Sequence, residues 1–208
     1  MLVEEDYVTR ENVVYATINE AKQQVLDRLL ESGYRCIPVL DEDGHTYAGN
    51  IYKVHLLSEQ LDNQFTGSIE QLVADQNDGF VYQDNSFVKV FSSIKKLPFL
   101  GVVDRDKHFL GILTNGNILE VLENAWGVHN GSYSLTIGTI EYSGALQRML
   151  RGVNKYCNVQ SVISLNNNSQ FVRRVCIVLP DDVDERLMRQ VVEELEKLNF
   201  TVTDIENL

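Results

Sequence analysis

The pattern of hydrophobic and polar positions over residues 33–57 recurs over residues 98–120. In each segment, five mostly apolar residues of strand character, at 36–40 in the first and at 99–103 in the second, are followed by an acidic turn, DEDG and DRDK respectively. A second apolar strand then runs through a glycine into the apolar start of a helix. Because two such strands around a short turn predict a β-hairpin, we expect the chain to contain the same hairpin twice.

The two hairpins align residue by residue. Asp41 matches Asp104 at an offset of 63. Gly49 matches Gly111 at an offset of 62, because the first copy has one extra residue in its turn. This internal repeat predicts two copies of one folding unit.

A helical pattern precedes each hairpin, with hydrophobic residues three and four positions apart over 21–30 and over 87–94. We expect Asn19 to cap the first helix and Asp84 or Asn85 to cap the second. Short strands are expected before these helices, at 13–16 and at 80–82. The repeated unit is therefore strand, helix, strand, strand, helix.

The C-terminal third has a different order of elements. Helical spacing predicts helices over 144–156 and 184–198, and NNNSQ at 166–170 predicts a turn. Runs of apolar and β-branched residues predict four strands, at 133–140, 159–165, 171–179 and 201–205. The resulting order, βαββαβ, is that of a ferredoxin-like sandwich.

These patterns divide the chain into domains. We expect one copy of the repeat over 1–62 and the other over 63–126, with 63–77 as a connecting segment. GVHNGS at 127–132 is a plausible linker, and the third domain then spans 133–208.

Length, composition and net charge limit the classes of function that the chain can have. The chain has 208 residues, of which 44% are hydrophobic, so it is long enough to bury a sizeable core. Its formal net charge is -12, which argues against nucleic acid as a partner because phosphate binding needs clustered positive charge.

The cysteines, the lengths of the apolar runs and the N-terminal residues together predict a cytoplasmic protein. Cys36, Cys157 and Cys176 lie far apart and lack the spacing of zinc ligands, so we expect free thiols and no metal site. No apolar run approaches the ~20 residues of a membrane span. The N-terminal MLVEEDYVTR is acidic and lacks a signal-peptide core, so we expect no membrane association.

The repeated hairpin resembles the CBS motif, and the resemblance is strongest in GYRCIPVLD at 33–41. Two copies of the hairpin resemble a CBS pair, or Bateman module. The C-terminal third is similar to an ACT domain, whose first loop usually carries a Gly-x-Leu sequence, as in Gly144 to Leu146. The whole chain resembles the small CBS-ACT proteins of Gram-positive bacteria that bind cyclic di-AMP. The fold class this implies is α/β (α+β), with tandem CBS motifs followed by a ferredoxin-like ACT domain.

CBS pairs bind adenosine nucleotides in clefts between their motifs, so the resemblance implies candidate binding residues. These are Val14, Ala16, Tyr34, Arg35, Cys36, Ile37, Pro38, Thr114, Asn115 and Asn117, with Gly144 and Leu146 as a possible ACT ligand loop. Pro38 lacks a backbone N–H, so nearby backbone groups are expected to remain free to read adenine. Arg35 suits a phosphate, and Thr114 stands at a strand-to-helix junction that suits phosphate or sugar.

The chain departs from the usual pattern, in which an acid three residues after a threonine binds the ribose hydroxyls. The second copy has Asn117 at the acidic position, and the first has Tyr52 and His55 at the two positions. A neutral amide suits a cyclic dinucleotide better than a carboxylate does, because one ribose oxygen of that ligand is esterified to phosphate. We therefore expect cyclic di-AMP, with AMP, ADP or ATP as the alternative ligand.

Other roles for these residues remain open. Thr114 or Asn115 can cap the helix that follows, Arg35 can be a solvated surface charge, and Tyr34 can belong to the core. His55 can be an ordinary helix residue.

We expect a regulatory protein and no enzyme. The sequence has no nucleophile motif, P-loop, Rossmann glycine pattern or HExxH, so we expect no catalytic residue and no cofactor. The expected assembly is a homodimer that signals to a protein target. Two rival functions stay open: an amino-acid-responsive regulator with the CBS pair as scaffold, and an assembly module that binds no ligand.

Overall fold

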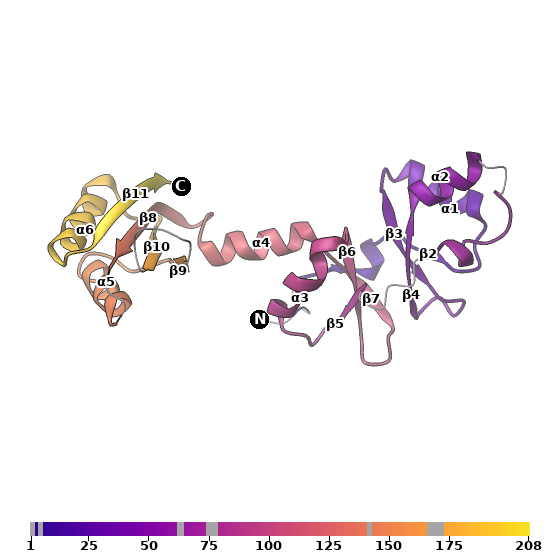
Figure 1. Ribbon diagram of the computed structural model, residues 1–208, viewed down its shortest axis with the longest axis horizontal. Coiled ribbons are helices and arrows are strands. Elements are labelled where there is room, and N and C mark those ends of the chain that lie inside the picture. The colour runs from indigo at the N-terminus through magenta and orange to yellow at the C-terminus, as the bar shows by residue number, and fades with distance from the viewer. Residues whose placement is uncertain (1–2, 4–5, 62–64, 74–78, 141–142, 166–172) are drawn as a thin grey trace. The chain divides into compact units, whose positions relative to one another are not determined.

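A computed structural model describes the chain except for residues 1–2, 4–5, 62–64, 74–78, 141–142 and 166–172. The contacts within the chain divide it into two compact units (Figure 1). Unit 1 is Met1–Leu119 and unit 2 is Glu120–Leu208. Within the described residues, no helix has both the length and the hydropathy needed to cross a membrane.

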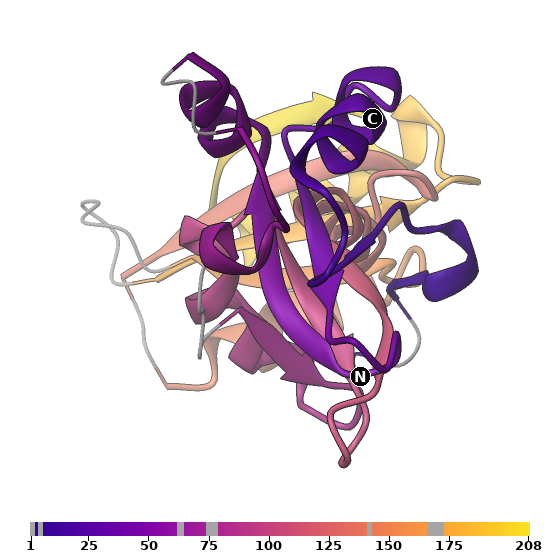
Figure 2. The ribbon, with the colours of Figure 1, turned by 90° about the vertical axis from the view of Figure 1, so that its right-hand side faces the viewer.

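The first copy of the repeat forms a three-stranded sheet. Strand β3 (Cys36–Leu40) lies between β2 (Ala16–Thr17), which is parallel to it, and β4 (Tyr47–Tyr52), which is antiparallel. Helices α1 (Lys22–Glu31) and α2 (Lys53–Leu61) lie at the same end of these strands (Figure 2). The apolar side chains of α1 pack against the sheet, because positions 25, 26 and 29 of the helix all face the core.

The second copy repeats these elements. It contains β5 (Phe80–Tyr82), α3 (Phe87–Ser93), β6 (Phe99–Val103), β7 (Phe109–Thr114) and α4 (Asn115–Trp126). Its sheet gains a fourth strand, β1 (Val8–Thr9), and the strand order is β1-β7-β6-β5. The hairpin register is the same in both copies, since Cys36 pairs with Tyr52 and Phe99 with Thr114. Each hairpin strand β3 and β6 has the bounds that the sequence predicts.

Short 3₁₀ helices occur at Arg10–Asn12, Glu70–Leu72 and Ile94–Lys96. Because of the first of these, the strand expected at 13–16 is shorter and begins later in the structure. Only Ala16 and Thr17 pair with β3, because the backbone N–H of Val13 closes the 3₁₀ turn onto Arg10 before the strand begins. The third follows α3 directly, so the α-helical part of this segment ends at Ser93.

The predicted caps of α1 and α3 are wrong. The N-cap of α1 is Ala21, because Asn19 instead accepts a hydrogen bond from the Thr17 hydroxyl at 3.0 Å, two residues earlier. The N-cap of α3 is Ser86. Asn85 accepts a hydrogen bond from the Tyr82 backbone N–H at 3.3 Å, so this amide closes the turn before the helix.

The two copies are joined at the tips of their hairpins. The backbone N–H of Phe109 donates to the backbone carbonyl oxygen of His45 at 2.7 Å, and the rings of Tyr47 and Phe109 stack with centroids 6.0 Å apart. The hydroxyl of Tyr47 also donates to the carbonyl oxygen of Gly79, in the second copy, at 3.2 Å. The copies therefore share one apolar cluster, which fixes the geometry between their sheets.

Unit 2 is a ferredoxin-like sandwich, as the sequence predicts. Its elements are β8 (Gly131–Thr139), α5 (Ala145–Val153), β9 (Ser161–Leu165), β10 (Arg173–Pro180), α6 (Glu185–Lys197) and β11 (Thr201–Asn207). All neighbouring strands are antiparallel, in the order β11-β8-β10-β9. Helices α5 and α6 lie together against one face of the sheet (Figure 1), where residues such as Met149 and Leu195 are fully buried.

Several boundaries in unit 2 differ from those expected. Strand β8 begins at Gly131, inside the stretch expected as a linker, and α5 ends at Val153, three residues before the predicted end. Asp184 caps α6 by accepting a hydrogen bond from the Leu187 backbone N–H at 2.8 Å. The turn expected at 166–170 lies outside the described residues, as does part of the connecting segment at 63–77.

Candidate functional site

A cavity of about 460 Å³ opens in unit 1 between the two copies of the repeat. This volume falls within the range of small-molecule sites. Its lining residues are Val8, Asn12, Val13, Val14, Gly33, Tyr34, Arg35, Cys36, Ile37, Pro38, Pro98, Phe99, Ile112 and Thr114. Both copies contribute to this lining, so the cavity depends on the way the copies meet.

The start of β3 forms one wall because the chain turns sharply after α1. Gly33 has a φ of +73°, a left-handed conformation that glycine adopts without strain, and it lets the chain reverse into β3. Strand β2 pairs only with Val39 and Leu40. Among the described strands, none therefore pairs with Cys36–Pro38 on that side, and the backbone there faces the cavity.

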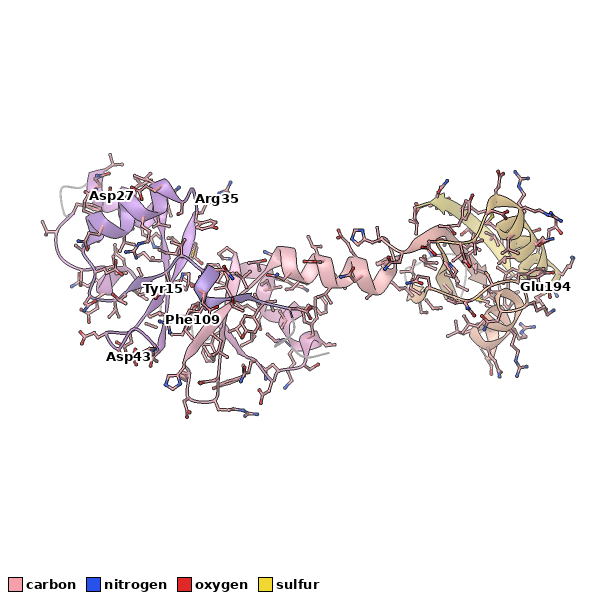
Figure 3. All side chains as sticks on the ribbon, turned by 180° about the vertical axis from the view of Figure 1, so that it is seen from behind. Tyr15, Asp27, Arg35, Asp43, Phe109 and Glu194 are labelled. Atoms are coloured by element: carbon pink, nitrogen blue, oxygen red, sulfur yellow. The ribbon has the colours of Figure 1, made fainter. Side chains whose placement is uncertain are left out.

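The side chains of this wall differ in exposure. Cys36, Ile37 and Pro38 are buried, whereas Tyr34 is 54% exposed and so is not part of the core. Arg35 is exposed at the surface of unit 1, at the opposite end of the β3–β4 hairpin from Asp43 (Figure 3).

Thr114 lines the cavity and also caps α4. Its hydroxyl donates to the side-chain oxygen of Asn117 at 2.7 Å and accepts from the Asn117 backbone N–H at 3.2 Å. The Asn117 side-chain oxygen accepts in turn from the Thr114 backbone N–H at 3.0 Å. This reciprocal arrangement is a capping box with an amide in the usual place of a glutamate or glutamine.

The other candidate residues are placed as follows. Val14 lines the cavity, but Ala16 does not, because it lies fully buried in the core of the first copy. Asn115, the first residue of α4, is exposed, and neither it nor Asn117 lines the cavity.

The possible ACT loop lies in unit 2. Gly144 is the N-cap of α5 and has a φ of +72°, while Leu146 packs half-buried against the core of that unit.

Seven lining residues were not among the predicted site residues: Val8, Asn12, Val13, Gly33, Pro98, Phe99 and Ile112. Two of them could have been predicted from the internal repeat, because Pro98 and Phe99 match Arg35 and Cys36 at an offset of 63. Val8 had no such signal, since it reaches the cavity through β1, a strand that the sequence pattern did not predict.

The cavity is electrostatically unlike the rest of the chain. Its described lining contains an arginine and no aspartate or glutamate, although acids outnumber bases by 30 to 18 over the whole sequence. Burial raises the pKa of the Cys36 thiol to about 12, and a hydrogen bond with the Tyr52 side chain offsets part of that rise. The thiol is therefore neutral at physiological pH, and Arg35 is the charged group of the wall.

Residues 3–62 match the family model of the CBS domain. In structure, the chain is similar to CbpB in its complex with c-di-AMP, with 20% sequence identity and a TM-score of 0.53 over 59% of this chain and 85% of that chain. It is similar to a CBS domain-containing protein from Bacillus anthracis, with 26% identity and a TM-score of 0.54 over 59% and 93% of the two chains.

A third similar structure is a CBS domain pair/ACT domain protein from Thermotoga maritima, with 20% identity and a TM-score of 0.50 over 59% and 96% of the two chains. No curated protein sequence matches the chain. The match over 3–62 and these likenesses confirm the predicted resemblance and the mixed α/β fold class.

Proposed function

We propose that the cavity of unit 1 binds an adenine nucleotide, specifically cyclic di-AMP, and that the chain is a cytoplasmic regulatory protein and not an enzyme. In this proposal it acts as a homodimer and signals to a protein target. The observation that carries the proposal is the cavity itself, in which an apolar slot, an unpaired strand edge and Arg35 meet without a carboxylate in the described lining.

The slot suits a purine. Val14, Ile37 and Ile112 offer apolar contact, and the backbone of Cys36–Pro38 offers hydrogen-bonding groups at the rim. A planar heterocycle with polar edges needs both kinds of contact in one place. Arg35 stands at the same rim, where its guanidinium can pair with a phosphate in two parallel hydrogen bonds.

The lack of an acid at position 117, where the usual CBS pattern has one, supports a cyclic dinucleotide over a mononucleotide. The position that would carry the ribose-binding acid is Asn117, and its side-chain oxygen already accepts two hydrogen bonds from Thr114. A free pair of ribose hydroxyls would thus lack its carboxylate acceptor. The complex of CbpB with c-di-AMP supports the same ligand class. AMP, ADP and ATP are the rival ligands.

Calorimetry of the purified full chain tests the proposal. We expect cyclic di-AMP to bind with a low-micromolar dissociation constant, and AMP, ATP and a panel of amino acids to bind more weakly or not at all. Absence of heat with cyclic di-AMP at ~100 μM would contradict the proposal. Binding of an amino acid alone would favour the rival in which unit 2 is the sensor.

Replacing Arg35 by alanine tests the phosphate contact. We expect Arg35→Ala to weaken cyclic di-AMP binding by about 1 to 3 kcal/mol, because a hydrogen bond to a charged group is lost. Arg105→Ala is the matched control, since Arg105 is an exposed arginine of the same unit that does not line the cavity. Equal affinities of the two variants would indicate that Arg35 is a solvated surface charge and does not contact the phosphate.

A further inference from the structure

Unit 1 has a second cavity of about 400 Å³ beside the first. It is lined by Tyr52 at the end of β4, by Lys53, Val54 and Leu57 of α2, and by Arg35, Cys36 and Pro98. We infer that this second cavity holds the second adenine of the dinucleotide, so that a single cyclic di-AMP spans both cavities. The inference rests on the proposed function and adds to it a binding subsite.

The two cavities share a wall. Arg35, Cys36 and Pro98 line both of them. Cys36 and Pro98 belong to different copies of the repeat, so the wall marks the place where the copies approach each other. A ligand that reaches from one cavity into the other must pass this wall, and Arg35 is the charged residue there.

The second cavity has the chemistry of a base-binding slot. Its open surface is almost wholly apolar. The half-buried ring of Tyr52 contributes an aromatic face, and this ring lies beside the ring of His55, with centroids 5.5 Å apart. Stacking on an aromatic side chain is a common way to bind a nucleic-acid base, because every base has a π-face.

Charge supports an anionic ligand at the shared wall. The described linings of both cavities contain no aspartate or glutamate. Arg35 is the cationic residue that lines both cavities, whereas Lys53 lines the second cavity with its alkyl chain and donates its ammonium to the Leu29 carbonyl oxygen at 3.5 Å. In a chain with a net charge of -12, two described linings without acids and an arginine between them fit a ligand whose phosphates lie at the shared wall.

The similar volumes of the two cavities match a ligand with two equal halves. A mononucleotide fills one cavity and leaves the other empty. A cyclic dinucleotide fills both, and its two bases then act as linked ligands, whose second contact forms at a high effective concentration. The second cavity therefore determines the preference for the dinucleotide.

A pair of matched variants on α2 tests this inference. Val54 lines the second cavity and is 60% exposed, whereas Leu61 is 83% exposed on the same helix and lines neither cavity. We expect Val54→Glu to weaken cyclic di-AMP binding at least about ten-fold, because a carboxylate would enter the slot and face the phosphates. Leu61→Glu, the same change in charge, is expected to leave the affinity within about two-fold of wild type.

Tyr52→Ala is a second, independent variant. Loss of the stacking face is expected to weaken binding about five-fold or more. Thermal unfolding of each variant without ligand shows whether it is folded. Wild type is expected to bind one dinucleotide per chain in calorimetry.

The outcomes separate the two proposals. Wild-type binding of cyclic di-AMP together with unchanged affinity in both Val54→Glu and Tyr52→Ala would overturn the second subsite and leave the proposed function standing. Two dinucleotides per chain would also overturn it, since the cavities would then be separate sites. No wild-type binding would overturn the proposed function and the subsite with it.

Discussion

Thr114 both caps α4 and lines the candidate site. Its hydroxyl forms the capping box with Asn117, and its side chain also faces the cavity. The sequence left two roles open for it, a helix cap and a ligand contact. The structure shows the cap. The ligand contact stays a prediction, with which the place of Thr114 in the cavity lining is consistent.

Replacing Thr114 by valine tests the cap. Valine has nearly the same shape but lacks the hydroxyl, so we expect Thr114→Val to lower the free energy of unfolding by about 1 kcal/mol. Hydrogen exchange of the Asn117 amide, measured by NMR, should become faster because its acceptor is gone. Thr114→Ser retains the hydroxyl and is the control. If both variants are equally stable, the capping box does not contribute to stability.

Strand β1 shows how one element links the N-terminus to the candidate site. It pairs with β7 in the register Val8 to Ile112 and Thr9 to Gly111. A Cβ at Gly111 would lie 2.0 Å from the Val8 carbonyl oxygen, which is far closer than any real contact. Only glycine permits this approach, and the approach places Val8 at the cavity.

Gly111→Ala is therefore expected to displace β1. We expect the free energy of unfolding to fall by about 1 to 3 kcal/mol, and nucleotide affinity to fall as well because Val8 leaves the cavity wall. Gly116→Ala is the matched control within α4, where the nearest atom to a new Cβ is the Thr114 hydroxyl at 3.4 Å. There we expect stability to stay constant or to rise by up to about 1 kcal/mol. Denaturant unfolding and calorimetry of both variants check the expectation, and equal effects would contradict it.

Over the whole molecule, the charge opposes the ligand that the cavity suits. Residues 1–119, which form unit 1, hold 18 acids and 10 bases. The long-range field of the unit is thus negative, although the described linings of the two cavities hold cations and no acids. An anionic dinucleotide must approach against this field before it meets Arg35.

Salt should therefore speed the association of cyclic di-AMP. The Debye length falls from about 30 Å at 0.01 M salt to about 8 Å at 0.15 M, so the repulsion is screened while close contacts persist. We expect the association rate constant to rise by a factor of about two to five over this range, measured by stopped flow with a fluorescent dinucleotide analogue. A rate constant that falls with salt would mean that the local cations dominate the approach.

Periodicity in the sequence was enough to predict most elements. The spacing of apolar residues predicted both hairpins, the helices that flank them and the βαββαβ order of unit 2, because each of these depends on which face of a local segment is buried. The structure agrees, and strands β3 and β6 have the predicted bounds. The resemblance built on these elements is confirmed by the CBS match over 3–62 and by the similar structures.

Hydrophobic spacing is a local property of the chain, so it is sufficient to predict the repeated unit and the order of elements. Which polar groups pair, and which residues meet at the cavity, depends on the tertiary structure. Asn19 bonds within its turn instead of capping α1, Ala16 turns into the core while Val14 reaches the cavity, and Val8 arrives from a strand without a local signal. These outcomes depend on side chains that converge from distant segments, and local spacing carries no information about that convergence.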